Sequence, residues 1–264
     1  MGHPVAHTRS PKIHALFAEQ FERELVYSAI DVLPENFAAE VQNFFAAGGK
    51  GLNITVPHKQ AAFALVDELT PRAQRAGSVN TLAPLPNGKI LGDNTDGAGL
   101  LRDLCGRMGM HLRGKRILLI GAGGAARGAM AFLIDIKPVS LEVSNRGQPR
   151  LLDLLHDFTG YADEHGVALR AAGSGPYDLI VNATSAHHTG QLPQIPPAAI
   201  GVHTVCYDMG YGSEGTAFAR WAQAQGAARV EMGLGMLVEQ AAEAFKLWHG
   251  LFPVTGPVLA VIQR

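Results

Sequence analysis

Apolar positions along the first eighty residues follow two different spacings. After Ser10-Pro11 they recur every three to four residues, which predicts a helix with Ser10 as its N-cap. Residues 25–32 and 51–56 alternate as strands do, and residues 34–49 predict a helix that ends at glycine. Another helix is expected to open at Thr70-Pro71.

Asn87-Gly88 lies between two apolar runs and is a strong hairpin signal. A symmetric turn at this dipeptide would place Asn80 opposite roughly position 95, close to Asp96. The pattern therefore predicts that polar residues from both arms of the hairpin lie together.

Beyond residue 110 the pattern changes to short apolar strands separated by helical or irregular stretches, and residues 235–250 predict a last helix. Such alternation is typical of a parallel, doubly wound sheet. We predict two α/β domains: residues 1–95 together with 232–264, and residues 96–231.

The composition is that of an ordinary globular chain, with 264 residues, 47% of them hydrophobic and 17% charged, and a net charge of −1. Without a basic stripe, nucleic acid is not an expected partner. No apolar run is long enough for a membrane span and no signal-peptide core is present, which predicts a cytoplasmic location. Cys105 and Cys206 lie in apolar neighbourhoods, so reduced core thiols are expected.

The stretch GAGGAARG begins at Gly121, directly after an apolar strand and before an apolar helix. In that context glycines permit a tight turn and let backbone N–H groups approach a pyrophosphate. The alternative is a turn needed only to pack strand on helix. The flanking elements favour a dinucleotide site.

The next strand ends in Asn145 and Arg146, with Arg150 shortly after, where NAD-binding chains usually place a carboxylate. Two guanidinium groups suit a 2′-phosphate. The alternative is a pair of solvated surface arginines. NADP is favoured over NAD.

Lys59 follows Pro57 at the start of a predicted helix, where the helix dipole disfavours an ammonium group. A carboxylate nearby would offset this effect, and the hairpin register makes Asp96 a candidate. Such a pair is a plausible acid–base group for a hydroxyl or carbonyl. An exposed surface lysine is the alternative.

Several polar residues stand beside these elements. The hydroxyls of Thr8 and Ser10 at a helix start are able to receive a carboxylate. Asn53, Thr55 and Asn80 interrupt apolar strands, and each is either a ligand-binding or a solvent-facing residue. His187-His188 is a candidate metal-binding pair. However, adjacent histidines point to opposite faces of a strand, and no carboxylate lies at ligand spacing, so no metal site is predicted.

Taken together, nine stretches in order resemble the shikimate/quinate dehydrogenase family: PVAHTRSPKIH, AAGGKGLNITVPHK, AGSVNTL, LGDNTDGAGLL, LLIGAGGAARG, SNR, VNATS, YDMGY and GLGMLVEQAA. They extend over nearly the whole chain. The resemblance implies an N-terminal α/β substrate-binding domain and a Rossmann-type NADP-binding domain. It also implies NADPH-linked, reversible reduction of 3-dehydroshikimate to shikimate, a step of aromatic amino-acid biosynthesis. Separately, we expect a monomer or a homodimer.

The resemblance also implies roles for individual residues. It assigns Lys59 and Asp96 to catalysis, and assigns substrate binding to Thr8, Ser10, Asn53, Thr55, Asn80, Tyr211 and Gln240. The cofactor is expected at the pyrophosphate turn (Gly121, Gly123, Gly124, Ala125), the adenosine phosphate site (Asn145, Arg146, Arg150) and the nicotinamide side (Thr184, Met209, Gly233, Met236).

The chain departs from the family pattern in two informative places. The family has a strand ahead of the first motif, whereas this sequence starts at Met1-Gly2, so we expect either a shortened chain or a fold without that strand. Gly147 replaces a usual threonine, which removes one hydroxyl from the expected phosphate site.

Three alternatives to a strict shikimate dehydrogenase remain. One is a quinate/shikimate dehydrogenase of broader specificity. Another is a non-catalytic regulator that binds NADP or a metabolite; the presence of both Lys59 and Asp96 argues against it. The third, a different two-domain dehydrogenase, is disfavoured by the substrate-side motifs.

Overall fold

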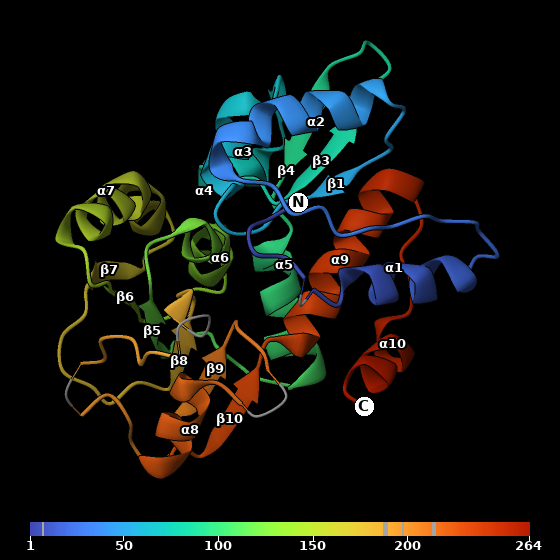
Figure 1. Ribbon diagram of the computed structural model, residues 1–264. Coiled ribbons are helices and arrows are strands. Elements are labelled where there is room, and N and C mark those ends of the chain that lie inside the picture. Colours follow the sequence, from blue (N-terminus) through green and yellow to red (C-terminus); the bar gives the residue numbers. More distant parts are fainter. Residues whose placement is uncertain (7, 187–189, 197, 213–214) are drawn as a thin grey trace. The chain divides into compact units, whose positions relative to one another are not determined.

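A computed structural model describes residues 1–6, 8–186, 190–196, 198–212 and 215–264 (Figure 1). The chain forms two compact units: unit 1 comprises Met1–Asp103 and Gly235–Arg264, and unit 2 comprises Leu104–Leu234. The packing thus divides the chain at 103/104 and 234/235, eight residues after the predicted boundary at 95/96 and three after that at 231/232.

Unit 1 contains a four-stranded sheet of order β1-β3-β4-β2 with helices from both of its chain segments. Its elements are α1 (Ser10–Glu19), η1 (Pro34–Asn36), α2 (Phe37–Ala46), β1 (Leu52–Asn53), α3 (Lys59–Leu65), β2 (Glu68–Leu69), α4 (Pro71–Ala76), β3 (Thr81–Pro84), β4 (Ile90–Asp93), α5 (Asp96–Leu101), the start of η2 (Arg102–Arg107), α9 (Leu234–His249) and α10 (Thr255–Ile262).

Residues 1–3 hydrogen-bond to two other segments of unit 1. On one side the Thr55 N–H donates to the Met1 carbonyl at 3.0 Å, and the His3 N–H donates to the Val56 carbonyl at 3.0 Å. On the other side the Val32 N–H donates to the Gly2 carbonyl at 3.0 Å. These residues therefore lie between segments 30–32 and 53–56 and pair with both.

The predicted strand over residues 25–32 is wrong, because only a parallel bridge between Gly2 and Asp31 forms there. Within this segment Leu25 and Tyr27 are half-buried, whereas Val26 is 98% exposed. The strand predicted over residues 51–56 is likewise shorter, and β1 is confined to Leu52–Asn53.

Two local signals at helix starts have different outcomes. Thr70 caps α4, since its hydroxyl accepts the Ala73 N–H at 3.3 Å, and Pro71 is the first helical residue, as predicted. Ser10 is not an N-cap: α1 begins at Ser10 itself, and Arg9 precedes it without a side-chain cap.

The hairpin forms, but its register differs by one residue from the prediction. Thr81 pairs with Asp93, which puts Asn80 opposite Asn94 instead of position 95. The turn is centred before Asn87-Gly88, because the Gly88 N–H donates back to the Leu85 carbonyl at 3.0 Å. Gly88 adopts a positive φ of 82°, the conformation for which glycine is suited.

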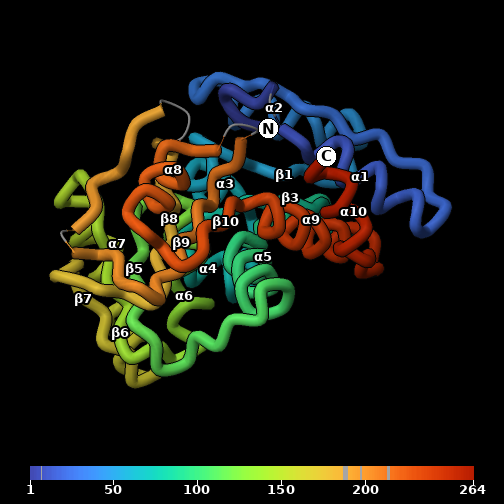
Figure 2. Tube along the Cα trace, turned by 90° about the horizontal axis from the view of Figure 1, so that it is seen from below, coloured from blue at the N-terminus to red at the C-terminus, as the bar shows by residue number. Residues whose placement is uncertain are grey.

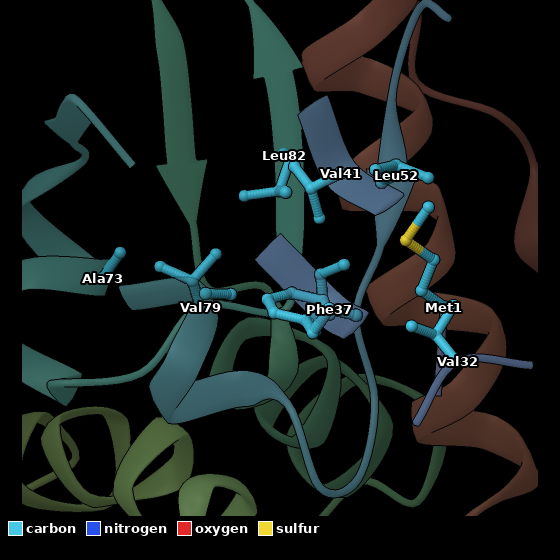
Figure 3. Packing of buried hydrophobic residues seen from close by; sticks show 10 residues of the cluster. Met1, Val32, Phe37, Val41, Leu52, Ala73, Val79 and Leu82 are labelled. Carbon is cyan, nitrogen blue, oxygen red and sulfur yellow. The ribbon is translucent and has the colours of Figure 1, made fainter. Parts of the chain in front are cut away.

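The core of unit 1 joins side chains from the sheet and its covering helices (Figure 3). The labelled members are Met1, Val32, Phe37, Val41, Leu52, Ala73, Val79 and Leu82. Helix α9 lies beside the hairpin (Figure 2), where the Trp248 indole N–H donates to the Leu82 carbonyl at 3.0 Å. The late segment is therefore part of the same unit as residues 1–103.

Unit 2 is built on a six-stranded parallel sheet of order β10-β9-β8-β5-β6-β7. Its elements are β5 (Arg116–Ile120), α6 (Gly124–Asp135), β6 (Ser140–Ser144), α7 (Gln148–Glu164), β7 (Ala168–Ala171), β8 (Leu179–Asn182), β9 (Val205–Asp208), α8 (Ala217–Ala224) and β10 (Arg229–Met232). The strand order reverses between β5 and β8, as in doubly wound dinucleotide-binding folds. The predicted fold class is confirmed.

The two cysteines differ in environment. Cys206 on β9 is buried, as expected, whereas Cys105 is exposed, so the prediction of a core thiol is wrong there. Cys105 belongs to the π-helical turn η2, where its neighbour Leu104 is the buried residue. In the described part of the chain, no helix has the length and apolarity that crossing a membrane requires.

Candidate active site

Lys59 and Asp96 form an ion pair in unit 1. Lys59 is the first residue of α3 and Asp96 the first residue of α5. The Lys59 ammonium donates to Asp96 Oδ2 at 2.5 Å, and the two side chains are 13% and 6% exposed. The structure therefore brings the predicted catalytic residues together in a largely buried pair.

Asn80 holds the other oxygen of the same carboxylate. Its Nδ2 donates to Asp96 Oδ1 at 2.9 Å, and its Oδ1 accepts the backbone N–H of Thr95 at 2.9 Å. Asn80 is 2% exposed, so the solvent-facing alternative does not apply. Asp96 is thus fixed by one cation and one amide.

Gln240 reaches this cluster from α9. Its Oε1 accepts hydrogen bonds from Asn80 Nδ2 and Thr95 Oγ1, both at 3.3 Å. The side-chain amide N–H donates to the Leu237 carbonyl at 3.0 Å. A predicted substrate residue distant in sequence therefore lies against the Asn80 amide.

The hydroxyls of Thr8 and Ser10 lie together at the start of α1. Thr8 Oγ1 donates to Ser10 Oγ at 3.1 Å, and the Ser10 N–H donates to Thr8 Oγ1 at 3.3 Å. Both residues are half-buried. Two neighbouring hydroxyls at a helix start suit a carboxylate ligand.

Asn53 and Thr55 differ, although both precede Pro57 in the same segment. The Asn53 amide is engaged on both sides: its Oδ1 accepts the Tyr27 hydroxyl at 2.8 Å and its Nδ2 donates to Thr81 Oγ1 at 3.1 Å. Thr55 is exposed, and its methyl group lies close to Gly2. The structure brings Asn53 into the cluster and leaves Thr55 at its surface.

Tyr27 is a residue that sequence reasoning missed. Its ring stacks on His14 with centroids 4.4 Å apart and planes 7° from parallel. Burial raises the pKa of the Tyr27 hydroxyl above its ordinary value, while a hydrogen bond with Ser10 opposes that shift. Burial also lowers the pKa of His14 to about 3, so the stacked ring is neutral. Tyr27 is thereby linked to both Ser10 and Asn53.

The glycine turn of unit 2 lies at the point where the strand order reverses. Gly121 has φ +115°, and a Cβ atom there would lie 3.2 Å from the backbone C and O of Ala183. Gly123 precedes α6 without a side-chain cap, Gly124 and Ala125 begin that helix, and a Cβ at Gly123 would meet nothing within 4 Å. The open N-terminus of a twelve-residue helix fits a pyrophosphate.

Arg146 and Arg150 follow β6 on the exposed surface of unit 2. In the described ranges neither guanidinium group has a hydrogen bond or an ion pair, which leaves both available for a ligand. Asn145 Nδ2 donates to the Gly147 carbonyl at 2.8 Å and so shapes the turn between them. This set fits a 2′-phosphate.

The ends of β8 and β9 carry a polar network that the sequence analysis did not identify. Thr184 Oγ1 donates to Asn182 Oδ1 at 2.8 Å, and Asn182 Nδ2 donates to Asp208 Oδ1 at 3.1 Å. Asp208 Oδ2 accepts the Thr216 hydroxyl at 2.5 Å. The available signal was a polar residue ending each of two apolar strands, which in parallel strands meet at one edge.

Met209 and Gly233 are also brought together in unit 2, since a Cβ at Gly233 would lie 2.3 Å from the Met209 carbonyl oxygen. The remaining two predicted residues fall in different units. Half-buried Tyr211 belongs to unit 2, and buried Met236 belongs to unit 1.

The described residues include no cluster of histidine, cysteine, aspartate or glutamate suited to a metal ion. His187-His188 lies outside the described residues.

Comparison with known proteins identifies the family of the chain. Residues 1–82 match the shikimate dehydrogenase substrate binding domain, and residues 233–255 match the shikimate 5'-dehydrogenase C-terminal domain. Over its whole length the chain is 49% identical to shikimate dehydrogenase (NADP(+)) of Hahella chejuensis, and the alignment covers 97% of that relative. The chain belongs to the shikimate dehydrogenase family.

Two solved structures are similar to the chain over its whole length. One is an Ael1 enzyme from Pseudomonas putida, with 41% identity and a TM-score of 0.87 over all of this chain and 96% of the other. Another is shikimate 5-dehydrogenase from Thermus thermophilus in complex with NADP(H) and shikimate, with 35% identity and a TM-score of 0.85 over all of this chain and 97% of the other. As a shikimate dehydrogenase family member, the chain shares its whole fold with these proteins.

Proposed function

We propose that the protein catalyses the reversible, NADPH-dependent reduction of 3-dehydroshikimate to shikimate, with unit 1 holding the substrate and unit 2 the cofactor. The observation that carries the proposal is the buried Lys59–Asp96 pair. Relatives named shikimate dehydrogenase (NADP(+)) and a neighbour solved with NADP(H) and shikimate support the choice of substrate and cofactor.

The residues of unit 2 fit NADP. The glycine turn at Gly121 and Gly123 would receive the pyrophosphate, and Arg146 and Arg150 the 2′-phosphate. When bound, NADPH supplies the hydride that reduces the substrate carbonyl. Thr184, which the Asn182–Asp208 network holds in place, would line the nicotinamide side.

The residues of unit 1 orient the substrate and manage the proton. Thr8 and Ser10 would hold its carboxylate, while Asn53, Asn80 and Gln240 would take its ring hydroxyls. Lys59 donates a proton to the substrate oxygen at C3 that develops negative charge. Until the proton is transferred, the ammonium group stabilises that developing charge. Asp96 holds the lysine side chain in place through their hydrogen bond.

Both candidate sites are built from residues of one chain, so a monomer and a homodimer are equally compatible with the proposal. We place the reaction in the cytoplasm, which supplies NADPH to biosynthesis. Shikimate is favoured over quinate as the substrate on the names of the relatives.

The test is NADPH oxidation with 3-dehydroshikimate, together with the reverse reaction using shikimate or quinate and either NADP or NAD. We expect turnover with shikimate and NADP, and little with quinate. Lys59→Ala should lower kcat by about a hundredfold or more. Folded wild-type protein that binds NADPH without turning over substrate would contradict the proposal.

A matched control is Lys89→Ala in the same unit. Lys89 also pairs with a carboxylate, that of Glu68 at 3.1 Å, but the two side chains are 51% and 44% exposed. Exposed pairs contribute little energy, so this variant should keep the wild-type kcat. A similar loss in both variants would show that the effect of Lys59→Ala is not specific to the buried pair.

A further inference from the structure

Thr81 lies between two groups of candidate site residues. It is the first residue of β3, and its side chain is fully buried. On one side its Oγ1 accepts Asn53 Nδ2 at 3.1 Å, and the Asn53 Oδ1 accepts the Tyr27 hydroxyl at 2.8 Å. These two hydrogen bonds connect Thr81 to residues on the substrate-binding side.

On its other side Thr81 reaches the candidate proton-transfer pair. Thr81 Oγ1 donates to Asn80 Oδ1 at 2.9 Å, and Asn80 Nδ2 donates to Asp96 Oδ1 at 2.9 Å. Asp96 Oδ2 in turn accepts the Lys59 ammonium. One threonine hydroxyl therefore joins the two halves of a continuous row of hydrogen bonds.

Along this row of hydrogen bonds, each group's role as donor or acceptor is determined by the role of its neighbour. The Thr95 N–H and the Asp96 carboxylate fix the Asn80 amide, so that its oxygen faces Thr81. A hydroxyl has one proton, and Thr81 gives it to that oxygen, so Thr81 accepts from Asn53 Nδ2. The Asn53 oxygen is then left to face the Tyr27 hydroxyl.

We propose that Thr81 is a positioning residue of this enzyme, whose hydroxyl fixes the orientation of the Asn53 amide relative to the Asn80–Asp96–Lys59 group. The inference rests on the proposed function. Without the hydroxyl, Asn80 keeps Thr95 and Asp96 as partners, whereas among the described residues Asn53 Nδ2 keeps only a 3.4 Å contact with the Asn80 carbonyl. The Asn53 Oδ1 keeps the Tyr27 hydroxyl at 2.8 Å, so the loss of Thr81 Oγ1 weakens the hold on the Asn53 amide at its nitrogen.

The test compares Thr81→Val with Thr81→Ser, because valine keeps the shape without the hydroxyl and serine keeps the hydroxyl. Small displacements of positioning groups lower rates by about a hundredfold, so Thr81→Val should lower kcat/KM for shikimate by about tenfold to a hundredfold. Thr81→Ser should stay within about threefold of wild type, and the Kd for NADPH should be unchanged in both variants.

A double-mutant cycle separates positioning from a general structural role. If Thr81 acts through Asn53, then Thr81→Val should have little further effect on kcat/KM in an Asn53→Ala background, since coupled residues are not additive. Fully additive losses, or equal losses in the valine and serine variants, would overturn the proposal.

Thr204→Val is a matched control in unit 2. Thr204 is 1% exposed, and its hydroxyl donates to the Tyr177 carbonyl at 2.6 Å. This variant should lower Tm while the KM for shikimate is kept. Inactive wild-type protein would contradict the proposed function itself, whereas active wild type with an unaffected Thr81→Val variant would overturn only the role of Thr81.

Discussion

Lys59 and Asp96 are each the first residue of a helix, and their charged groups meet 2.5 Å apart. A helix N-terminus favours a carboxylate and disfavours an ammonium group. Asp96 is therefore in its preferred place, while Lys59 relies on Asp96 for compensation. Lys59 therefore stands at an electrostatically unfavourable helix start, and the Asp96 carboxylate offsets that unfavourable interaction.

The first prediction concerns this dependence. Asp96→Asn replaces the carboxylate by an uncharged amide of the same shape and so removes the compensating charge. We expect kcat to fall by about a hundredfold or more while the protein stays folded. Steady-state kinetics with circular dichroism measures both properties. Asp67→Asn, which changes a carboxylate of the same unit outside the cluster, should leave kcat unchanged; a comparable drop there would argue against a special role for Asp96.

A second prediction separates the two roles of glycine in the turn after β5. Gly121→Ala forces a side chain into φ +115° and against the Ala183 backbone, which should cost about 1–3 kcal/mol and lower Tm by several degrees. Gly123→Ala meets no protein atom within 4 Å, so Tm should be retained while the KM for NADPH rises. Thermal melts and kinetics would check this, and equal melting temperatures for the two variants would refute it.

The third prediction tests the cofactor preference. Arg146→Ala should raise the KM for NADPH by about tenfold and leave the KM for NADH unchanged, because only NADPH carries the 2′-phosphate. Arg113→Ala is the control. Arg113 is exposed and precedes β5, so it lies at the amino ends of the strands, whereas Arg146 follows the carboxyl end of β6. Parallel losses with both cofactors would place Arg146 outside the phosphate site.

A fourth prediction concerns acid stability of unit 2. Burial of Glu142 opposes its ionisation, but hydrogen bonds from the Gly173 N–H, the Tyr177 hydroxyl and Arg170 outweigh it and lower the pKa to about 2. Because the folded pKa lies below the ordinary value, this stabilisation is complete above about pH 4.5 and is lost as the pH falls toward 2.

Glu142→Gln should therefore reduce the free energy of unfolding by about 1–3 kcal/mol at pH 7, with a shallower loss between about pH 5 and 3. Urea unfolding across that range measures the slope. Glu164→Gln, on the exposed surface of α7, should keep the wild-type slope. An unchanged slope in Glu142→Gln would show that this carboxylate does not control acid stability.

Much of the fold follows from local signals in the sequence. The glycine turn, the strand–helix alternation and the cap at Thr70 depend on neighbours within a few residues, and each was predictable. The register of the hairpin was not, because the hydrogen bond between Gly88 and Leu85 moved the turn. The predicted strand at residues 25–32 failed because its only bridge partner in the described chain is Gly2.

The site was predictable where residues combine a polar side chain with an unusual position, as Lys59 does. The partnership of Asn182 with Asp208 depends on which strands are neighbours in the sheet, and the contact between Tyr27 and Asn53 depends on tertiary packing. The sequence marks the polar residues that end β8 and β9, but it does not report which strands are neighbours or which side chains tertiary packing brings together. The missed residues are accordingly those that support others.

Unit 1 is discontinuous, whereas unit 2 is one uninterrupted segment. During synthesis on the ribosome, residues 1–103 emerge first, yet α9 with Gln240 and Trp248 emerges only after all of unit 2. Since domains tend to fold as they emerge, unit 2 is able to fold while unit 1 still lacks a helix. The part of the protein that is translated first is thus completed last.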